Sequence, residues 1–329
     1  MGSCINKQDS HLQRSESIQS STDMNYNFAT FYIPKKESAT LFVGDDVLEN
    51  FRLEKMVTKS QNFDSFDEKE KEANDQFSKA HPLYMIVSSM NSHEKRTLPS
   101  IKFENGLSYE GEWLEGARNG FGTQIWPDGS FYTGNWNNDL PHGQGTLYFS
   151  SGQKYEGQFF QGQANGIGTY YINCHKQYEG EWLKDTQHGF GKEFWVQGAT
   201  YEGNFKSGAR HGKGKLLFPD GSNYEGSFED DYIQGYGTYV WKDKKVYMGK
   251  WEKSKMNGPG ETNWSDGKVY IGNYQNDKKH GQGTFIWPDG RKYEGCWKEG
   301  KQDGIGIFHN GKGEKRKGKW ENGIRVSWE

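Results

Sequence analysis

The chain has 329 residues and a net charge of −3, with 32% hydrophobic residues, 16% aromatic residues and 44 glycines. With so few apolar residues, large flat rings rather than a wide aliphatic core must hold the fold together, and no stretch approaches the roughly 18 apolar residues of a membrane span. The three cysteines, Cys4, Cys174 and Cys296, are odd in number and widely spaced, which argues against a disulfide framework and a zinc site. The N-terminus lacks the apolar segment of a secretory signal, so we expect a cytosolic, reducing compartment.

The first residues, Met1-Gly2-Ser3-Cys4, predict lipid attachment. Gly2 becomes a myristoylation site once Met1 is removed, although Asn6 stands where Ser or Thr is usual. Cys4 would then lie at the bilayer surface, where it can take palmitate. One acyl chain holds a protein only marginally whereas two hold it stably, so Gly2 and Cys4 predict a two-signal membrane anchor. The alternative is an ordinary N-terminus that happens to contain small residues.

Residues 1–100 predict a largely disordered tether, because Ser, Asn, Asp, Lys and Gln dominate them without a sustained period. A short helix is expected over 64–80, and the apolar run 83–87 is expected to cap the region that follows. Only Gly2 and Gly44 of all the glycines precede residue 101. This shift in composition divides the chain into 1–100 and a second region, 101–329.

The second region repeats every 23 residues. In the first copy Tyr109 is followed by Gly111 and Trp113, and nine copies keep this Tyr-x-Gly-x-aromatic pattern. A tenth copy, residues 316–320, keeps the spacing but lacks the Tyr. A fixed period of this length indicates a repeat array, here of about ten units.

Each unit predicts a β-hairpin. Residues 109–113 alternate aromatic and acidic positions, which indicates a strand, and a polar connection over 114–119 leads to a second strand at 120–126. Pro127-Asp128-Gly129 then predicts a turn. Successive hairpins would continue one another, so the expected fold is all-β, an elongated single-layer antiparallel sheet. The glycines are expected to allow sharp bends and to let a ring lie on the backbone.

The units Tyr-Glu-Gly-Glu-Trp (109–113), His-Gly-Gln-Gly-Thr (142–146) and Tyr-Glu-Gly-Cys-Trp (293–297) resemble the MORN repeat, the membrane occupation and recognition nexus. The resemblance covers 109–320 and implies an elongated sheet with a grooved aromatic face. It also implies a membrane-associated or cytoskeletal scaffold. Some similar proteins bind helical segments of partners, some form antiparallel dimers, and some are linked to phospholipids or to phosphoinositide kinases.

The sequence predicts no enzyme, cofactor or metal site. Four histidines precede Gly-x-Gly pairs in different units, at positions about 10 Å apart, which is too far for two of them to share a metal. These are His142, His188, His211 and His280. Two partial phosphate-loop patterns, at 295–300 and 313–318, are each followed by Lys but lack the Ser or Thr that would hold magnesium.

Binding is instead expected on the aromatic stripe, which suits an amphipathic helix of a protein partner. The predicted groove residues are Tyr132, Trp136, Tyr155, Phe159, Tyr178, Trp182, Tyr201, Phe205, Tyr224, Phe228, Tyr247 and Trp251. A basic cluster is a candidate contact for anionic lipid, with a solvated end of the array as the alternative. It consists of Lys312, Lys315, Arg316, Lys317 and Lys319. Basic and acidic residues are equal in number over 101–329, so no nucleic-acid partner is expected.

The leading hypothesis is a non-enzymatic adaptor, anchored at the inner face of a membrane by acyl chains and presenting a binding groove in the cytoplasm. A structural element of the axoneme or cell cortex, located at the cytoskeleton or cilium, is the first alternative. A phospholipid-binding regulator of a phosphoinositide kinase is the second. The partner, the membrane and a homodimeric state are left open by the sequence.

Overall fold

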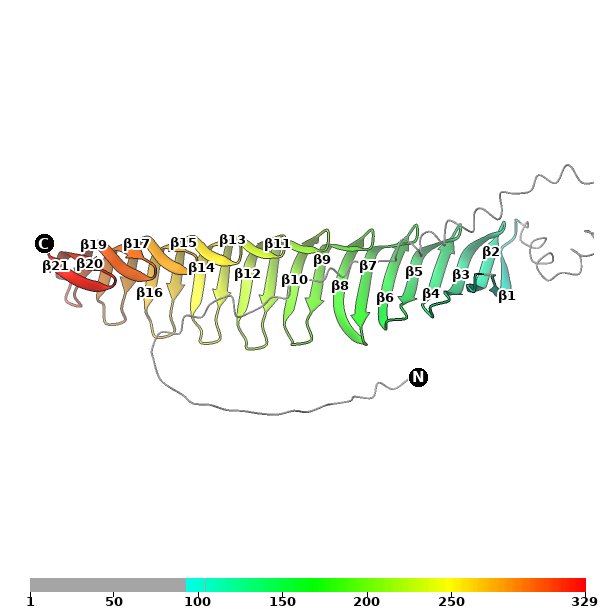
Figure 1. Cartoon of the computed structure of the whole chain (residues 1–329), viewed down its shortest axis with the longest axis horizontal. Coiled ribbons are helices and arrows are strands. Elements are labelled where there is room, and N and C mark those ends of the chain that lie inside the picture. The colour runs from blue at the N-terminus through cyan, green and yellow to red at the C-terminus, as the bar shows by residue number, and fades with distance from the viewer. Residues whose placement is uncertain (1–92, 104) are drawn as a thin grey trace, which may run out of the picture. The chain divides into compact units, whose positions relative to one another are not determined.

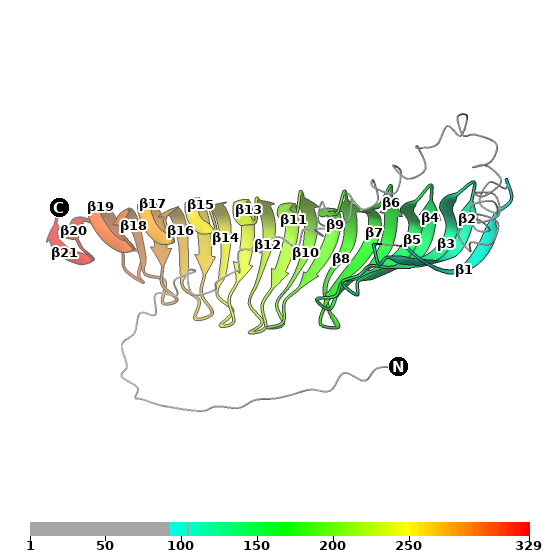
Figure 2. The same cartoon turned by 45° about the vertical axis from the view of Figure 1, so that its right-hand side comes forward.

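The computed structural model describes residues 93–103 and 105–329, and in this part of the chain all 21 strands belong to one antiparallel sheet. Figure 1 shows them in a row from β1 (cyan) to β21 (red), and Figure 2 shows the same order after a turn of 45°. Each strand pairs with the strands that precede and follow it in the chain. The predicted single-layer sheet of stacked hairpins is confirmed.

The strands are β1 (Arg96–Lys102), β2 (Ser108–Leu114), β3 (Ala117–Ile125), β4 (Phe131–Asn137), β5 (Leu140–Tyr148), β6 (Gln153–Phe160), β7 (Gln163–Ile172), β8 (His175–Leu183), β9 (Thr186–Phe194), β10 (Thr200–Lys206), β11 (Ala209–Leu217), β12 (Asn223–Glu229), β13 (Tyr232–Val240), β14 (Val246–Glu252), β15 (Lys255–Asn263), β16 (Val269–Gln275), β17 (Lys278–Ile286), β18 (Lys292–Lys298), β19 (Lys301–His309), β20 (Lys315–Glu321) and β21 (Ile324–Trp328).

The two strands of a unit are joined by a very short turn. Between β2 and β3 it consists of Glu115 and Gly116, whose φ angles are both positive at 49° and 78°. Two successive residues with positive φ form the hairpin turn whose twist matches that of the paired strands. The polar connection predicted over 114–119 is therefore too long, because β3 already begins at Ala117.

The turn between units is the one that the sequence predicted. The Trp126 N–H donates to the Ser130 carbonyl at 2.9 Å, and Gly129 has a φ of 86°. The Asp128 carboxylate accepts hydrogen bonds from the Ser130 hydroxyl at 2.6 Å and the Ser130 N–H at 2.9 Å. These two bonds lower the pKa of Asp128, because they stabilise its charged form.

The two glycines of a Gly-x-Gly pair have different roles. Gly120 has a φ of 109°, and near it the pairing of β2 with β3 slips by two residues, which makes a bulge. Gly122 supplies space, because a Cβ built there would lie 2.2 Å from the hydroxyl oxygen of Tyr109. The predicted bend occurs at Gly120, and the predicted packing of a ring on the backbone occurs at Gly122.

The repeated tyrosines and the aromatics that follow them form the core. The Tyr109 ring meets Trp113 of its own unit at 5.1 Å and Trp136 of the next unit at 5.4 Å, both edge to face. The same alternation continues to Tyr293 and Trp320. Edge-to-face pairs are a favourable arrangement of rings, so neighbouring units stabilise one another through a continuous aromatic chain.

The structure contradicts the predicted groove residues. Their side chains are only 0 to 4% exposed, so they cannot line an open groove. The affected residues are Tyr132, Trp136, Tyr155, Phe159, Tyr178, Trp182, Tyr201, Phe205, Tyr224, Phe228, Tyr247 and Trp251. The physical reason is that each tyrosine ring covers a glycine pair and contacts two further rings, which leaves this aromatic surface no area to offer a partner.

The sheet begins at Arg96, so β1 crosses the boundary that the composition places at residue 101. At the other end, Trp328 of β21 takes the place of the tyrosine that the tenth unit lacks. A Cβ on Gly318 would lie 2.9 Å from the Trp328 ring, and this ring meets Trp320 edge to face at 5.9 Å. The predicted helix over 64–80, the run 83–87 and the acylation sites Gly2 and Cys4 lie outside the described residues.

Candidate functional site

The face of the sheet opposite the tyrosine rings contains a groove of about 1420 Å³ between β9 and β16. Glycine pairs face each other across neighbouring strands along its floor, as Gly226 does with Gly237 and Gly249 with Gly260. The floor lies at the level of the backbone, because a Cβ on any of these four residues would point away from the groove, towards the tyrosine rings. The residues next to them in sequence rise on both sides.

Apolar side chains are exposed in the half of this groove that β13 to β16 form. Tyr236 of β13, Met248 of β14 and Ile271 of β16 are 62%, 43% and 49% exposed. Each stands one residue before or after a floor glycine, so strand alternation directs it away from the tyrosine core. These residues were not among the predicted binding residues, although the two-residue period of the strands places them on the face opposite Tyr-x-Gly-x-aromatic.

Pro259 lies inside β15 and lines the groove. A proline in a central strand normally costs a hydrogen bond of the ladder. At the equivalent position the N–H of Phe121 donates to Glu112 Oε2 at 2.5 Å, and that of Ile167 donates to Gln158 Oε1 at 2.8 Å. The N–H at this point of the bulge thus turns to a side chain instead of the neighbouring strand. Pro259 is tolerated for this reason, and it gives the groove a rigid apolar ring.

The charges along the groove are largely balanced. Glu202 pairs with Lys192 at 3.2 Å, and Glu225 pairs with Lys215 at 3.6 Å. Lys213 also donates to the Ser227 hydroxyl at 3.0 Å. Exposed pairs of this kind contribute little net energy. Shape and apolar contact, more than a strong electric field, therefore define what the groove can recognise.

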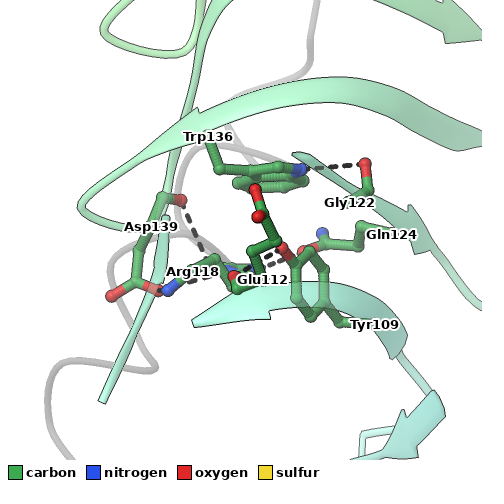
Figure 3. A network of polar contacts seen from close by, with 7 residues as sticks. All are labelled: Tyr109, Glu112, Arg118, Gly122, Gln124, Trp136 and Asp139. Carbon is green, nitrogen blue, oxygen red and sulfur yellow. Dashed lines mark hydrogen bonds and ion pairs between the residues drawn. The ribbon is translucent and has the colours of Figure 1, made fainter. Parts of the chain in front are cut away.

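A buried polar network ties neighbouring units together (Figure 3). Arg118 is 1% exposed, and its guanidinium lies 4.7 Å from the centre of the Trp136 ring and bonds to the Gln124 side-chain oxygen. The Asp139 carboxylate accepts from the Arg118 backbone N–H at 2.8 Å and from its Nε at 3.2 Å. Asp139 belongs to the turn of the next unit, so the contact fixes one hairpin on the preceding one.

Equivalent contacts recur along the array. Asp185 accepts from the Ala164 N–H at 2.7 Å, and Asp277 accepts from the Met256 N–H at 2.8 Å. Burial raises the pKa of Asp185 to about 6, partly offset by that hydrogen bond. Aspartates at 139, 185, 231 and 277 are spaced by two repeats, a signal that the sequence analysis did not use. Their role is structural, because they bind backbone at the unit boundary.

The core tyrosines are held as hydrogen-bond donors. Burial raises the pKa of Tyr293 to about 12 and raises that of Tyr178 still further from its ordinary value. The Tyr178 hydroxyl donates to the Glu181 carbonyl at 2.9 Å. Phenols in this state remain protonated at physiological pH, so they serve the backbone and offer no base.

The four repeated histidines lie apart in separate strands. His142 packs near the Phe160 ring at 5.3 Å, and His211 Nδ1 lies 3.7 Å from an Asp230 carboxylate oxygen. Within residues 93–103 and 105–329, no three His, Cys, Asp or Glu side chains come together in a way that could hold a metal ion.

The structure splits the basic cluster. Lys315, Lys317 and Lys319 alternate along β20 and so share the groove face, whereas Arg316 is on the other face, 5.9 Å from the Trp328 ring. Lys317 pairs with Glu329 at 2.5 Å and Lys319 with Glu321 at 3.0 Å. The remaining member, Lys312, is exposed in the turn before β20. In the described part of the chain, no helix is long and apolar enough to cross a membrane.

A sheet of stacked hairpins with a groove on one face is the architecture of a repeat protein of the binding or scaffold class. The MORN-repeat model matches residues 109–131, 132–154, 155–173, 178–200, 201–223, 224–246, 247–269, 270–290 and 293–315. These matches cover more than half of the sequence, and the chain belongs to the MORN-repeat family. Proteins built from these repeats are generally non-catalytic.

The solved structures that the comparison finds are only distantly similar to this chain. The TCP10 domain of Danio rerio CPAP, in a mutant form, is 12% identical with a TM-score of 0.30, over 70% of this chain and 99% of that one. The TCP domain of Drosophila melanogaster SAS-4, solved with a proline-rich motif of Ana2, is 11% identical with a TM-score of 0.26, over 62% and 90%. No curated protein matches the chain.

Proposed function

We propose that this protein is a non-enzymatic adaptor that binds an amphipathic helix of a partner protein in the groove between β9 and β16. The observation that carries the proposal is the exposure of Tyr236, Met248 and Ile271 above a floor of glycines. Large apolar side chains that remain exposed together mark interaction surfaces. A helix whose apolar face meets them, and whose polar edges meet the balanced Lys and Glu pairs, satisfies both features of the groove.

We also propose that acyl chains on Gly2 and Cys4 hold the adaptor at the inner face of a membrane. The support is the N-terminal sequence, in which a myristoylation site and a nearby cysteine provide two anchors. Residues 5–92 would then join the anchor to the array as a tether. Cell fractionation of Gly2→Ala and Cys4→Ser variants tests this part, because both should shift to the soluble fraction. Undiminished membrane association of the double variant would reject it.

The groove is tested by placing charge in it. We expect Met248→Glu and Ile271→Glu together to reduce partner retention at least tenfold in a quantitative pull-down, because a few well-packed contacts dominate binding energy. Val196→Glu is the matched control, since Val196 is 79% exposed in a turn that does not line the groove. Partners lost from the double variant and kept by the control are then purified and titrated directly. Equal retention by both variants would reject the groove as the binding site.

One observation favours a second candidate, contact with anionic lipid. Lys315, Lys317 and Lys319 share one face of β20, where each basic residue near a charged membrane surface contributes about 1 kcal/mol. Their ion pairs with Glu329 and Glu321 reduce this attraction. Liposome binding that rises with phosphatidylserine content, and that falls when all three lysines are changed to Ala, would support the lipid contact. A cytoskeletal role is favoured instead if the native N-terminus carries no acyl chain.

A further inference from the structure

The groove face carries a second feature outside the groove, a row of three rings at the same position of successive units. Tyr148 ends β5, Tyr171 lies next to the end of β7, and Phe194 ends β9. Each ring follows the previous one by 23 residues. Tyr148 is 36% exposed, and Tyr171 and Phe194 are half-buried. We call these three residues the aromatic row. They are separate from the tyrosine core, because the buried residues Leu147, Tyr170 and Glu193 precede them.

Contacts with neighbouring side chains fix the orientation of these rings. The Phe131 ring stacks on Tyr148 at 4.3 Å with an interplanar angle of 16°. The Lys154 ammonium on the strand between lies 5.9 Å from the centre of the Tyr148 ring and 4.3 Å from that of Tyr171. Lys192 lies 5.7 Å from the Phe194 ring. Stacking and cation–π contacts thus orient the rings before any partner arrives.

The spacing of the row matches one kind of peptide. Successive rings are two strands apart, which is about 9.6 Å along the sheet. A polyproline II helix advances about 9.3 Å in each three-residue turn. Two turns of an α-helix, seven residues, advance about 10.5 Å, so over three rings an α-helix falls out of step by more than a polyproline helix does. A proline at every third residue would therefore meet each ring in turn.

The charges of the row also favour an uncharged segment. Each ammonium beside the rings is paired with a carboxylate: Lys154 with Glu156 at 2.9 Å, Lys176 with Glu179 at 2.7 Å, and Lys192 with Glu202 at 3.2 Å. This balance leaves no surplus to attract an acidic peptide. A lysine has three N–H donors, and one ion pair does not use all of them. The carbonyls of a polyproline II backbone have no internal partners, so they can accept hydrogen bonds from the remaining N–H groups of these lysines.

We propose that the aromatic row binds a proline-rich segment of a partner protein in the polyproline II conformation. The segment lies across β5 to β9, along the long direction of the sheet, and places a proline ring against each of Tyr148, Tyr171 and Phe194. This surface is separate from the groove that Met248 and Ile271 line. The array would then recognise two kinds of segment at two places on one face.

The test uses the full chain and fluorescein-labelled decaproline, with a ten-residue Gly-Ser peptide as the control, measured by fluorescence polarisation. Decaproline spans about 31 Å and covers all three rings, whereas tetraproline spans about 12 Å and covers a single step. We expect decaproline to bind at least tenfold more tightly than the Gly-Ser peptide and than tetraproline. Binding of decaproline no tighter than that of the Gly-Ser peptide overturns the proposal.

Variants locate the site. Tyr171→Ala should weaken decaproline binding about tenfold, because a central ring is the type of residue that dominates an interface. Tyr171→Phe keeps the ring and should retain binding within about twofold, which separates loss of the contact from loss of the fold. Tyr236→Ala, in the groove, should leave decaproline binding unchanged. If Tyr236→Ala weakens it as much as Tyr171→Ala does, the row is not the site, and the groove proposal stands or falls by its own pull-down.

Discussion

The Asp185 carboxylate accepts a hydrogen bond from the Ala164 backbone N–H at 2.7 Å, across the boundary between two repeat units. Asp185 is buried, and burial raises its pKa from 3.8 to about 6. The folded protein therefore binds this proton more tightly than the unfolded chain does. The stabilisation that comes from this proton is complete below about pH 4. It declines as the pH rises towards 6, where the folded protein must carry a buried charge.

We predict that Asp185→Asn removes this part of the pH dependence, because an amide oxygen can accept the same hydrogen bond without a charge. A shift of about two pKa units corresponds to at most about 3 kcal/mol at pH 7. Urea unfolding midpoints at pH 4, 5, 6 and 7 measure the effect, and the variant should gain on the parent as the pH rises. Asp230→Asn, with an 84% exposed side chain, is the control. The same slope in the parent and in Asp185→Asn would contradict the prediction.

A second prediction separates the ring of Tyr178 from its hydroxyl. Tyr178→Phe loses only what the hydroxyl donates, a 2.9 Å bond to the Glu181 carbonyl and a longer 3.4 Å contact with the His188 carbonyl, and should cost about 1 kcal/mol of unfolding free energy. Tyr178→Ala also removes the edge-to-face contacts with Trp182 and Phe205 and should cost about 3–5 kcal/mol. Chemical denaturation followed by tryptophan fluorescence compares the two. Equal losses of unfolding free energy in the two variants would mean that the ring contributes little to the packing between neighbouring units.

Two glycine substitutions test whether space or backbone conformation matters more. A Cβ on Gly191 would lie 2.3 Å from the Tyr178 hydroxyl oxygen, so Gly191→Ala must displace a core ring. Gly221 has open space around it but a φ of 88°, and Gly221→Ala should cost only the conformational penalty of about 1–2 kcal/mol. Thermal unfolding should show a clearly larger loss for Gly191→Ala. A larger loss for Gly221→Ala would contradict the role assigned to the second glycine of each pair.

A fourth prediction concerns the end of the array. Trp328 covers Gly318 and meets Trp320, so Trp328→Ala exposes the last unit. In a repeat array each unit is stabilised by its neighbours, so the loss of local stability should be greatest near the substitution. Hydrogen exchange should show faster exchange in β19 and β20 and unchanged exchange in β5 to β9. Uniform acceleration along the sheet would instead indicate that the whole array unfolds as one unit.

The sequence by itself determined the repeat, the hairpin unit and the antiparallel sheet. A 23-residue period without insertions leaves little choice of architecture, and Pro127-Asp128-Gly129 identifies its turn by residue type. Residue type also predicted that glycines make room for rings. These features are local, because they depend on residues within one unit or its immediate neighbour.

Only the tertiary structure decided which face is free. The pattern around Tyr178 and Trp182 is equally compatible with an exposed stripe and a buried one, since alternation places both rings on one face without saying what covers it. The fold buries them, because each tyrosine ring covers one glycine of its own strand and one of the next strand and meets rings on both sides. Contacts between units therefore moved the candidate site to the opposite face, where Met248 and Ile271 remain in contact with solvent.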